Sequence, residues 1–312
     1  MQTPGTEAVR PPVAASRGVA LTDAAWKWIL LVPAVVVVVG LLLFPMAMTL
    51  YVSLTDWHLY AYGRPVSFVG LQNWPRVVTD ITFLIPARNT VVFVLGSVPT
   101  SYLIGLSVAL ALNQITKGRR FFRVFFMMPL MISPVAISLV IGRMLLHESM
   151  GPINDILVRL GLPIVHWLTD PTMAMISLII VDAWHQSAFM ILMLTAGLQS
   201  LPQEPYEAAT VDGAGKWQTF WYITLPLLAP VSVTALLIRS LDAFKVVDIV
   251  KVVTGGGPGT ATESVTLAVY DLGVKAGDIA QGAAAAYSLL IIMMAFSAVL
   301  LLATRRWVRQ AS

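Results

Sequence analysis

The sequence predicts an all-α integral membrane protein with six transmembrane helices. Hydrophobic residues make up 57% of the 312 positions and charged residues only 12%, against about 25% charged residues in soluble domains. Six apolar segments are near or above the ~20 residues that a helix needs to cross a membrane. They cover approximately residues 26–54, 88–112, 123–146, 172–199, 223–249 and 280–304. Helices satisfy their own backbone hydrogen bonds in lipid, and the alternating pattern of a membrane β-barrel is absent.

Basic residues indicate how these helices are oriented. They are dense in the N-terminal tail, in the short connection between the second and third segments, and at the C-terminus. The residues are Arg10, Arg17, Lys27, Lys117, Arg119, Arg120, Arg123, Arg305, Arg306 and Arg309. With six crossings these regions share one side, which the positive-inside rule identifies as the cytoplasm. We therefore expect both termini, and the connection at 200–222, to be cytoplasmic.

The domain organisation follows from the same segments. Residues 1–25 are polar and rich in proline and alanine, and we interpret them as a disordered cytoplasmic tail. The apolar run that follows is longer than the 7–15-residue core of a signal peptide, which predicts a retained first crossing. The membrane domain then extends over 26–304, and a cytoplasmic tail over 305–312.

The connection at 200–222 is unusually apolar and aromatic for a solvated linker. Residues 207–226 read EAATVDGAGKWQTFWYITLP. Small helix formers begin this stretch, Gly213 interrupts it, and a second amphipathic segment runs to Pro226. We expect two short helices with a bend at Gly213 and Glu207 near a helix N-terminus, where the helix dipole favours a carboxylate. An ordinary amphipathic loop helix is the alternative.

The spacing E-A-A-x3-G-x9-I-x-L-P resembles the coupling loop, or EAA motif, of ABC importer permeases. Every fixed position is met. The resemblance implies that this loop docks into a cleft of a separate ATPase subunit. It implies ATPase coupling for Glu207, Ala208, Ala209, Asp212, Gly213, Ala214, Ile223, Leu225 and Pro226.

A second stretch, residues 239–262, resembles the region after the fifth helix in sugar permeases of the maltose and glycerol-3-phosphate importer type. It reads RSLDAFKVVDIVKVVTGGGPGTAT, with Val253 where leucine is usual, and it matches the first permease subunit of such systems. The resemblance implies a bacterial inner-membrane importer of sugars. Its implied partners are a second, different permease subunit, two copies of a cytoplasmic ATPase, an extracytoplasmic sugar-binding protein and membrane lipid.

The sequence lacks the motifs that several other functions require. The sequence has no G-x-x-x-x-G-K-[ST] phosphate loop, so ATP and magnesium are expected on the partner ATPase and no cofactor on this chain. There are no cysteines and only four histidines, which argues against a metal site or an enzymatic centre. The basic residues follow apolar runs, which favours membrane orientation over nucleic-acid binding. A secondary, ion-coupled transporter remains the main alternative.

Polar side chains inside the apolar segments are candidates for a sugar path, because placing them in hydrocarbon is costly. The fourth segment carries Asp182, Trp184, His185 and Gln186, which suit hydroxyl groups and the apolar face of a sugar ring. In the fifth segment Arg239 and Asp242 lie deepest. A satisfied structural polar pair remains an equal alternative for the first group, and a salt-bridged helix end for the second.

The extracytoplasmic connections are long. The last of them, residues 250–279, contains Gly255, Gly256, Gly257 and Pro258. Three glycines allow backbone excursions that side chains forbid, so we expect a flexible loop on which a binding protein docks. A mobile connector without function is the alternative.

Overall fold

The computed structural model describes residues 23–115 and 117–309. The chain divides into two compact units, residues 1–49 and 50–312. The predicted tail 1–25 lies outside the described residues except for its last three positions, which begin the first helix. The last helix continues to Arg309, so the predicted boundary at 304 falls inside it.

The first unit is helical throughout its described part. Helix α1 (Asp23–Val38) passes through a π-helical turn, η1 (Val39–Leu43), into α2 (Phe44–Ser53), whose last residues belong to the second unit. Its most apolar stretch, within Trp26–Ser53, buries nothing among the described residues. Leu41, for example, is 76% exposed. Such a surface requires lipid or protein to cover it.

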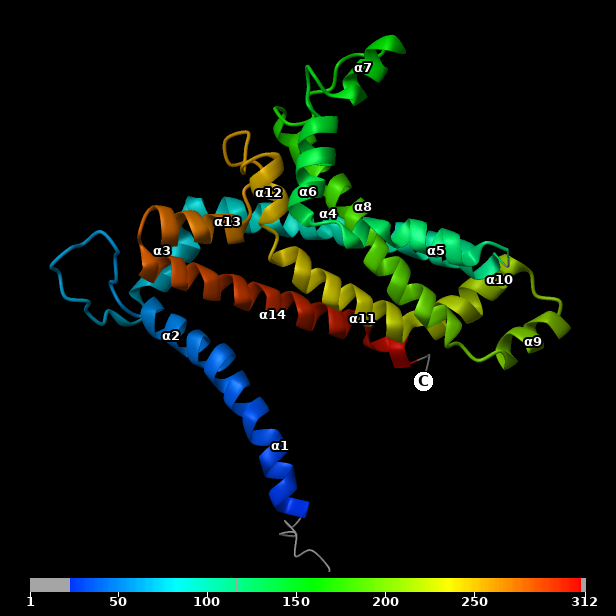
Figure 1. Ribbon diagram of the computed structural model, residues 1–312, viewed down its shortest axis with the longest axis horizontal. Coiled ribbons are helices and arrows are strands. Elements are labelled where there is room, and N and C mark those ends of the chain that lie inside the picture. Colours follow the sequence, from blue (N-terminus) through cyan, green and yellow to red (C-terminus); the bar gives the residue numbers. More distant parts are fainter. Residues whose placement is uncertain (1–22, 116, 310–312) are drawn as a thin grey trace, which may run out of the picture. The chain divides into compact units, whose positions relative to one another are not determined.

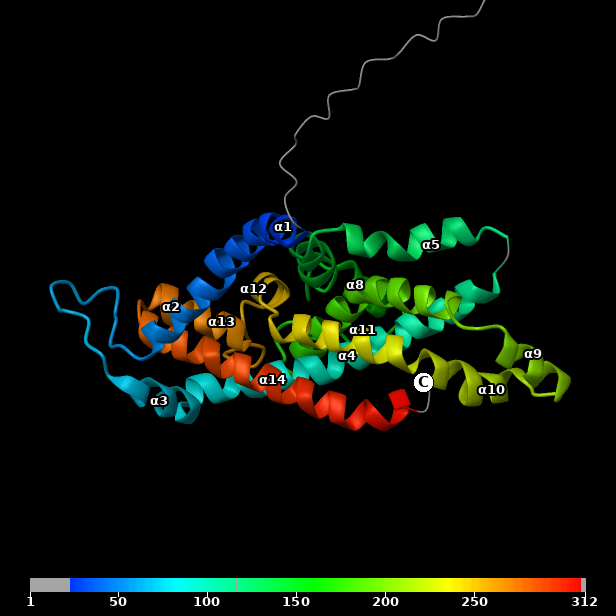
Figure 2. The same ribbon diagram turned by 90° about the horizontal axis from the view of Figure 1, so that it is seen from below.

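Four long helices form the core of the second unit. They are α4 (Ile81–Gln114), α8 (Pro171–Gln199), α11 (Leu225–Phe244) and α14 (Ile279–Arg309), and they pack side by side in Figures 1 and 2. The closest packing is between α4 and α8, where a Cβ on Gly105 would lie 2.3 Å from the Cβ of Met190. Small residues let membrane helices approach in this way.

The third predicted segment is not one straight helix. It consists of α5 (Arg119–Met127), a 3₁₀ turn η3 (Met128–Met131), α6 (Pro134–Ile137) and a π-helical stretch η4 (Ser138–Leu145). The two halves meet at an angle of 92°. Pro134 explains the break, because proline lacks the donor that would continue the helix and pushes the preceding residue into extended backbone. The described residues contain five helices that could cross a membrane, or six if this bent pair counts as one.

The fifth predicted segment is shifted along the chain. Helix α10 (Lys216–Thr219), a π-helical turn η5 (Phe220–Thr224) and α11 form one helix over Lys216–Phe244, where we predicted 223–249. The preceding short helix α9 (Glu204–Val211) lies at the same end of the unit as α10 (Figure 1).

The second unit also contains short elements, none of which lies beside α9 and α10 in Figure 1. They are η2 (Gly70–Gln72), α3 (Asn73–Thr79), α7 (Pro152–Arg159), α12 (Asp248–Val253), α13 (Val265–Tyr270) and η6 (Asp271–Lys275). Helix α4 begins at Ile81, earlier than the predicted 88, because Asp80 caps it by accepting a hydrogen bond from the Thr82 amide at 2.8 Å.

Candidate functional site

A buried ionic cluster joins three of the long helices. Arg239 of α11 donates hydrogen bonds to Asp182 of α8 and, at 2.8 Å, to the hydroxyl of Ser97 on α4. Ser97 also donates to Asp182. The side chains of Arg239 and Asp182 are 1% and 4% exposed. Each buried charge therefore has a partner, as charges removed from water require.

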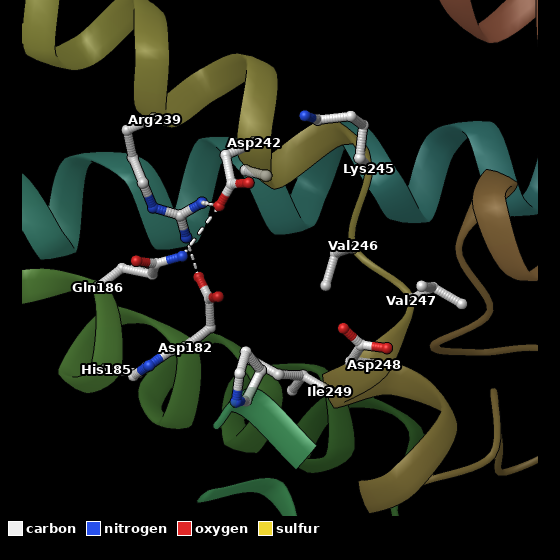
Figure 3. Close-up of a pocket in the computed structure, with 12 residues that line it drawn as sticks. Asp182, His185, Gln186, Arg239, Asp242, Lys245, Val246, Val247, Asp248 and Ile249 are labelled. Atoms are coloured by element: carbon white, nitrogen blue, oxygen red, sulfur yellow. Dashed lines mark hydrogen bonds and ion pairs between the residues drawn. The ribbon is translucent and has the colours of Figure 1, made fainter. Parts of the chain in front are cut away.

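A second pair extends this cluster towards solvent. The Asp242 carboxylate lies 3.6 Å from Nη1 of Arg239, and it accepts a hydrogen bond from the side-chain amide of Gln186 at 2.9 Å. Asp242 is 54% exposed, so its remaining acceptor capacity faces outward. Asp182, Gln186, Arg239 and Asp242, which the sequence places on two separate segments, thus form one connected group (Figure 3).

This group lines a cavity of about 260 Å³. The remaining walls come from Pro134 of α6, His185 of α8, and the chain from Ala243 to Ile249 at the end of α11 and the start of α12. His185 is 4% exposed and is packed into the wall of the cavity. The cavity offers carboxylates, an amide, an imidazole and apolar Val246, Val247 and Ile249. Such a surface can hydrogen-bond hydroxyl groups and pack against an apolar ring face.

Trp184 does not belong to this cavity. It is 40% exposed on α8 and is absent from the lining residues, because it lies on a different face of the helix from Asp182 and Gln186. The structure therefore separates it from the other three side chains of the predicted fourth-segment group.

Three functional candidates escaped the sequence prediction. Ser97 was one of many small residues in an apolar helix, and only the tertiary fold places it on Asp182 and Arg239. Lys245 and Asp248 fall inside the predicted fifth segment, 223–249, but α11 ends at Phe244 and the chain turns before α12. The turn brings both side chains to the cavity. The run of Val246 and Val247, both β-branched, could have signalled the helix break.

The motif loop forms a distinct site at the other end of the long helices. Glu207 lies in the first turn of α9, as predicted. It is exposed together with Ala208, whereas Ala209 packs inward and is 8% exposed. The hydroxyl of Tyr206 donates to Thr224 Oγ1 at 3.1 Å and ties α9 to η5. One face of α9 is thus anchored and the other is free to contact a partner.

Gly213 marks the bend, also as predicted. Its φ of +74° is in the left-handed region, and the Ala214 amide donates back to the Ala209 carbonyl at 2.9 Å. This closure is typical of helices that end on a glycine. Asp212, just before the bend, is exposed.

The second half of the motif is built differently from the expectation. Ile223, Leu225 and Pro226 are partly buried and lie within the continuous helix from Lys216 to Phe244. They position the loop on the membrane helix and do not form a separate exposed helix. Large exposed side chains precede them, with Trp217 at 73% and Tyr222 at 80%.

The glycine-rich connection is folded and not the flexible loop that the sequence suggested. Gly255 and Gly256 have positive φ values, and the Thr262 amide donates to the Gly256 carbonyl at 3.0 Å. The Thr262 hydroxyl donates to the Gly257 carbonyl at 2.7 Å. Asn89 of α4 donates to the Thr260 carbonyl at 2.8 Å. Gly255 remains exposed, and Gly257 and Pro258 are partly exposed.

The described residues contain no group of three histidine, aspartate or glutamate side chains placed to hold a metal ion. The candidate sites are the cavity beside Arg239, the motif loop around α9 and the glycine-rich connection.

Comparisons with known proteins identify the class. The family described as "Binding-protein-dependent transport system inner membrane component" matches residues 101–311. The chain belongs to this family and is a multi-pass membrane protein of the permease type. This agrees with the resemblance noted in the motif loop and in residues 239–262.

Curated relatives are similar over nearly the whole chain. The trehalose/maltose transport system permease protein MalF of Thermococcus litoralis is 37% identical over 89% of this chain and 93% of its own length. The sulfoquinovosyl glycerol transport system permease protein SmoG of Agrobacterium fabrum is 34% identical over 92% of both chains. The sn-glycerol-3-phosphate transport system permease protein UgpA of Agrobacterium fabrum is 32% identical over 87% of this chain and 92% of its own.

A solved structure shares the fold. A chain of the bacterial alginate ABC transporter, in complex with an alginate pentasaccharide-bound periplasmic protein, superposes with a TM-score of 0.77 and 22% identity. The match covers 91% of this chain and 95% of that one. The all-α membrane fold predicted from the sequence is thereby confirmed.

Proposed function

We propose that this chain is a pore-forming permease subunit of an ATP-driven importer for a sugar or oligosaccharide. The observation that carries the proposal is the motif loop, in which α9 presents Glu207 and Ala208 outward and closes on Gly213. A secondary transporter would have no use for such a loop. Relatives named for trehalose/maltose, sulfoquinovosyl glycerol and glycerol-3-phosphate transport support a sugar-related substrate.

In this proposal the motif loop is cytoplasmic and receives the ATPase. Two ATPase copies bind ATP and magnesium and push on this chain and on a second, different permease subunit. Both termini of this chain are cytoplasmic, and the chain itself performs no hydrolysis. The exposed Trp217 and Tyr222 beside α9 add apolar surface that a docked subunit would cover.

The cavity beside Arg239 serves as part of the sugar path. It combines Asp182, His185, Gln186 and Asp242 with apolar walls on three elements. Relatives named for neutral sugars and relatives named for phosphate- or sulfonate-bearing compounds both occur, so family membership leaves the charge of the substrate open.

The glycine-rich connection, with Gly255, Gly256, Gly257 and Pro258, serves as a landing surface for an extracytoplasmic sugar-binding protein. Thr260 is exposed and Glu263 partly so. Cysteines introduced at these two positions have no native competitors, since the chain has none. We expect crosslinks to the binding protein from both positions, and none above background from a cysteine at Val211, which is exposed at the other end.

The decisive test is purification of the chain from its native membrane, followed by reconstitution of the purified complex in vesicles. The chain should co-purify with an ATPase and a second permease, and vesicles should take up sugar only with ATP and the loaded binding protein. Uptake that follows an ion gradient without ATP would instead establish the secondary transporter. A purified complex lacking any ATPase would contradict the proposed role of α9.

A further inference from the structure

Acidic side chains outnumber basic ones around the cavity. Three carboxylates line it, those of Asp182, Asp242 and Asp248, against two permanent cations, Arg239 and Lys245. His185 is the remaining titratable group of the lining. The formal charge of the wall is therefore negative by one when the histidine is neutral.

Arg239 already pairs with two acids of the protein. Its Nη2 donates to Asp182 and Ser97, and its Nη1 lies 3.6 Å from Asp242, although Nη1 and Nε make no hydrogen bond among the described residues. Its side chain is 1% exposed. A phosphate or carboxylate on a solute that approached Nη1 would lie next to the Asp242 carboxylate, which is 3.6 Å from the same nitrogen, and the two like charges would repel each other.

The other two charges lie at the outer part of the cavity. Lys245 and Asp248 are exposed, and they project from the two ends of the short Val246–Val247 segment (Figure 3). An anion attracted by Lys245 therefore meets the exposed Asp242 and Asp248 carboxylates in the same cavity. Each cation among the described lining residues thus has an acid beside it or across the same cavity.

Hydroxyl groups meet the opposite situation. Each hydroxyl can both donate and accept, and the wall supplies open carboxylate acceptors on Asp242 and Asp248 together with the Lys245 amine and the His185 ring. Pro134, Val246 and Ile249 supply apolar surface. This combination matches an uncharged ring that carries several hydroxyls.

We propose that this cavity selects uncharged, polyhydroxylated solutes and disfavours sugar phosphates and sugar acids. The inference rests on the proposed function of the cavity as part of the sugar path. Asp242 and Asp248 are the residues that set the discrimination, since both are exposed in the cavity and neither forms the main partner of Arg239.

The test compares matched pairs of probes on the complete permease–ATPase complex in lipid nanodiscs, without the binding protein. Trehalose is paired with trehalose 6-phosphate, and cellobiose with cellobionate. Binding is followed by saturation-transfer NMR, which detects weak association. We expect the neutral member of a pair to bind about tenfold or more tightly than its anionic counterpart.

The double variant Asp242→Asn/Asp248→Asn should reduce this discrimination several-fold, because it removes two negative charges while keeping side-chain shape. The amide oxygen introduced at position 242 can still accept the hydrogen bond from Gln186, which protects assembly. The matched control is Asp155→Asn on α7, an exposed carboxylate that pairs with Arg159 and does not line the cavity. The control should discriminate like the wild type.

The outcomes separate the two proposals. Equal or tighter binding of the anionic probes to the wild type overturns the charge selectivity, as does unchanged discrimination in the double variant. If neither pair binds while ATP-driven sugar uptake is intact, the cavity is not the selective site although the transporter function stands. If uptake itself is absent with every sugar tested, the proposed function fails.

Discussion

The motif loop and the Arg239 cluster are built on opposite principles. The loop places Glu207, Ala208 and Gly213 within seven consecutive positions and exposes them. The cluster joins Ser97, Asp182 and Arg239, which are separated by 85 and 57 positions, and buries all three. A surface made for a partner can be local and open, whereas a charge in a membrane helix needs partners from other helices.

The largest difference between the regions should appear on removal of one member of the buried pair. Arg239→Met or Asp182→Leu alone leaves a buried charge unpaired and should destabilise the permease by about 3–5 kcal/mol. The double variant Arg239→Met/Asp182→Leu should recover most of that loss, because no lone charge remains. Thermal unfolding of the purified complex would measure the stability of the wild type, of both single variants and of the double variant.

Single variants as stable as the wild type would show that water reaches the cluster. The matched control in the motif loop is Glu207→Gln, an exposed residue whose replacement should leave the unfolding temperature unchanged.

A backbone substitution at the bend should affect coupling more than stability. Gly213 has open space where a Cβ would be placed but a φ of +74°, so Gly213→Ala introduces backbone strain of about 1–2 kcal/mol without a clash. We expect weaker recovery of the ATPase in pull-down experiments and lower ATP-dependent uptake. Gly213→Asn is the control, since asparagine tolerates this conformation better, and it should retain more of both. Identical behaviour of the two variants would remove the bend from the explanation.

Glu148, in the connection before α8, resembles the Arg239 cluster more than the motif loop, because its carboxylate is bound by residues from another part of the chain. A hydrogen bond from the Thr169 hydroxyl, followed by those from His166 and two backbone amides, lowers the pKa of Glu148 from 4.5 to about 2. A lowered pKa in the folded state stabilises the protein above the ordinary value and loses that contribution as pH falls through the folded value. Stability should therefore decline between about pH 4.5 and about pH 2.

The Glu148→Gln variant should be less stable than the wild type at neutral pH, and the gap should close as the pH falls through that range. Thermal unfolding as a function of pH measures both curves. Parallel curves would mean that another carboxylate controls the acid transition.

The smallest effect is expected at the tether of α9. Tyr206→Phe removes the hydrogen bond to Thr224, which is worth about 0.5–1.5 kcal/mol. The permease should fold normally, but hydrogen exchange of the α9 amides should quicken because the helix is held less firmly. Exchange that stays at the wild-type rate would assign the anchoring of α9 to the packing of Ala209 and its neighbours.

The sequence predicted the two regions unequally well. The bend at Gly213 and the place of Glu207 in the first turn of α9 were correct, because both depend on residues within one helical turn. The sequence also grouped Asp182 with Gln186, since residues four apart share a face. Trp184, which the sequence analysis placed in the same group, does not line the cavity, and the sequence could not pair Asp182 with Arg239 or find Ser97.

Boundaries failed where local signals conflict. The third segment is apolar enough to cross a membrane, yet Pro134 turns it by 92°. The fifth segment was extended through Lys245 and Asp248, although the helix ends at Phe244. The glycine-rich connection was expected to be flexible, but Thr262 and Asn89 hold its backbone. In each case the deciding contact comes from another part of the chain or from a backbone restriction at one residue.

By itself the sequence determined the membrane class, the all-helical solution and the motif loop, because hydropathy, backbone hydrogen bonding and local spacing act over short distances along the chain. The tertiary structure decided which polar side chains meet and where the chain turns at the end of α11. It also decided that the resulting cavity is lined by more acidic than basic side chains. Those features depend on how α4, α8 and α11 pack against one another, and side chains far apart in sequence become neighbours only when that packing is complete.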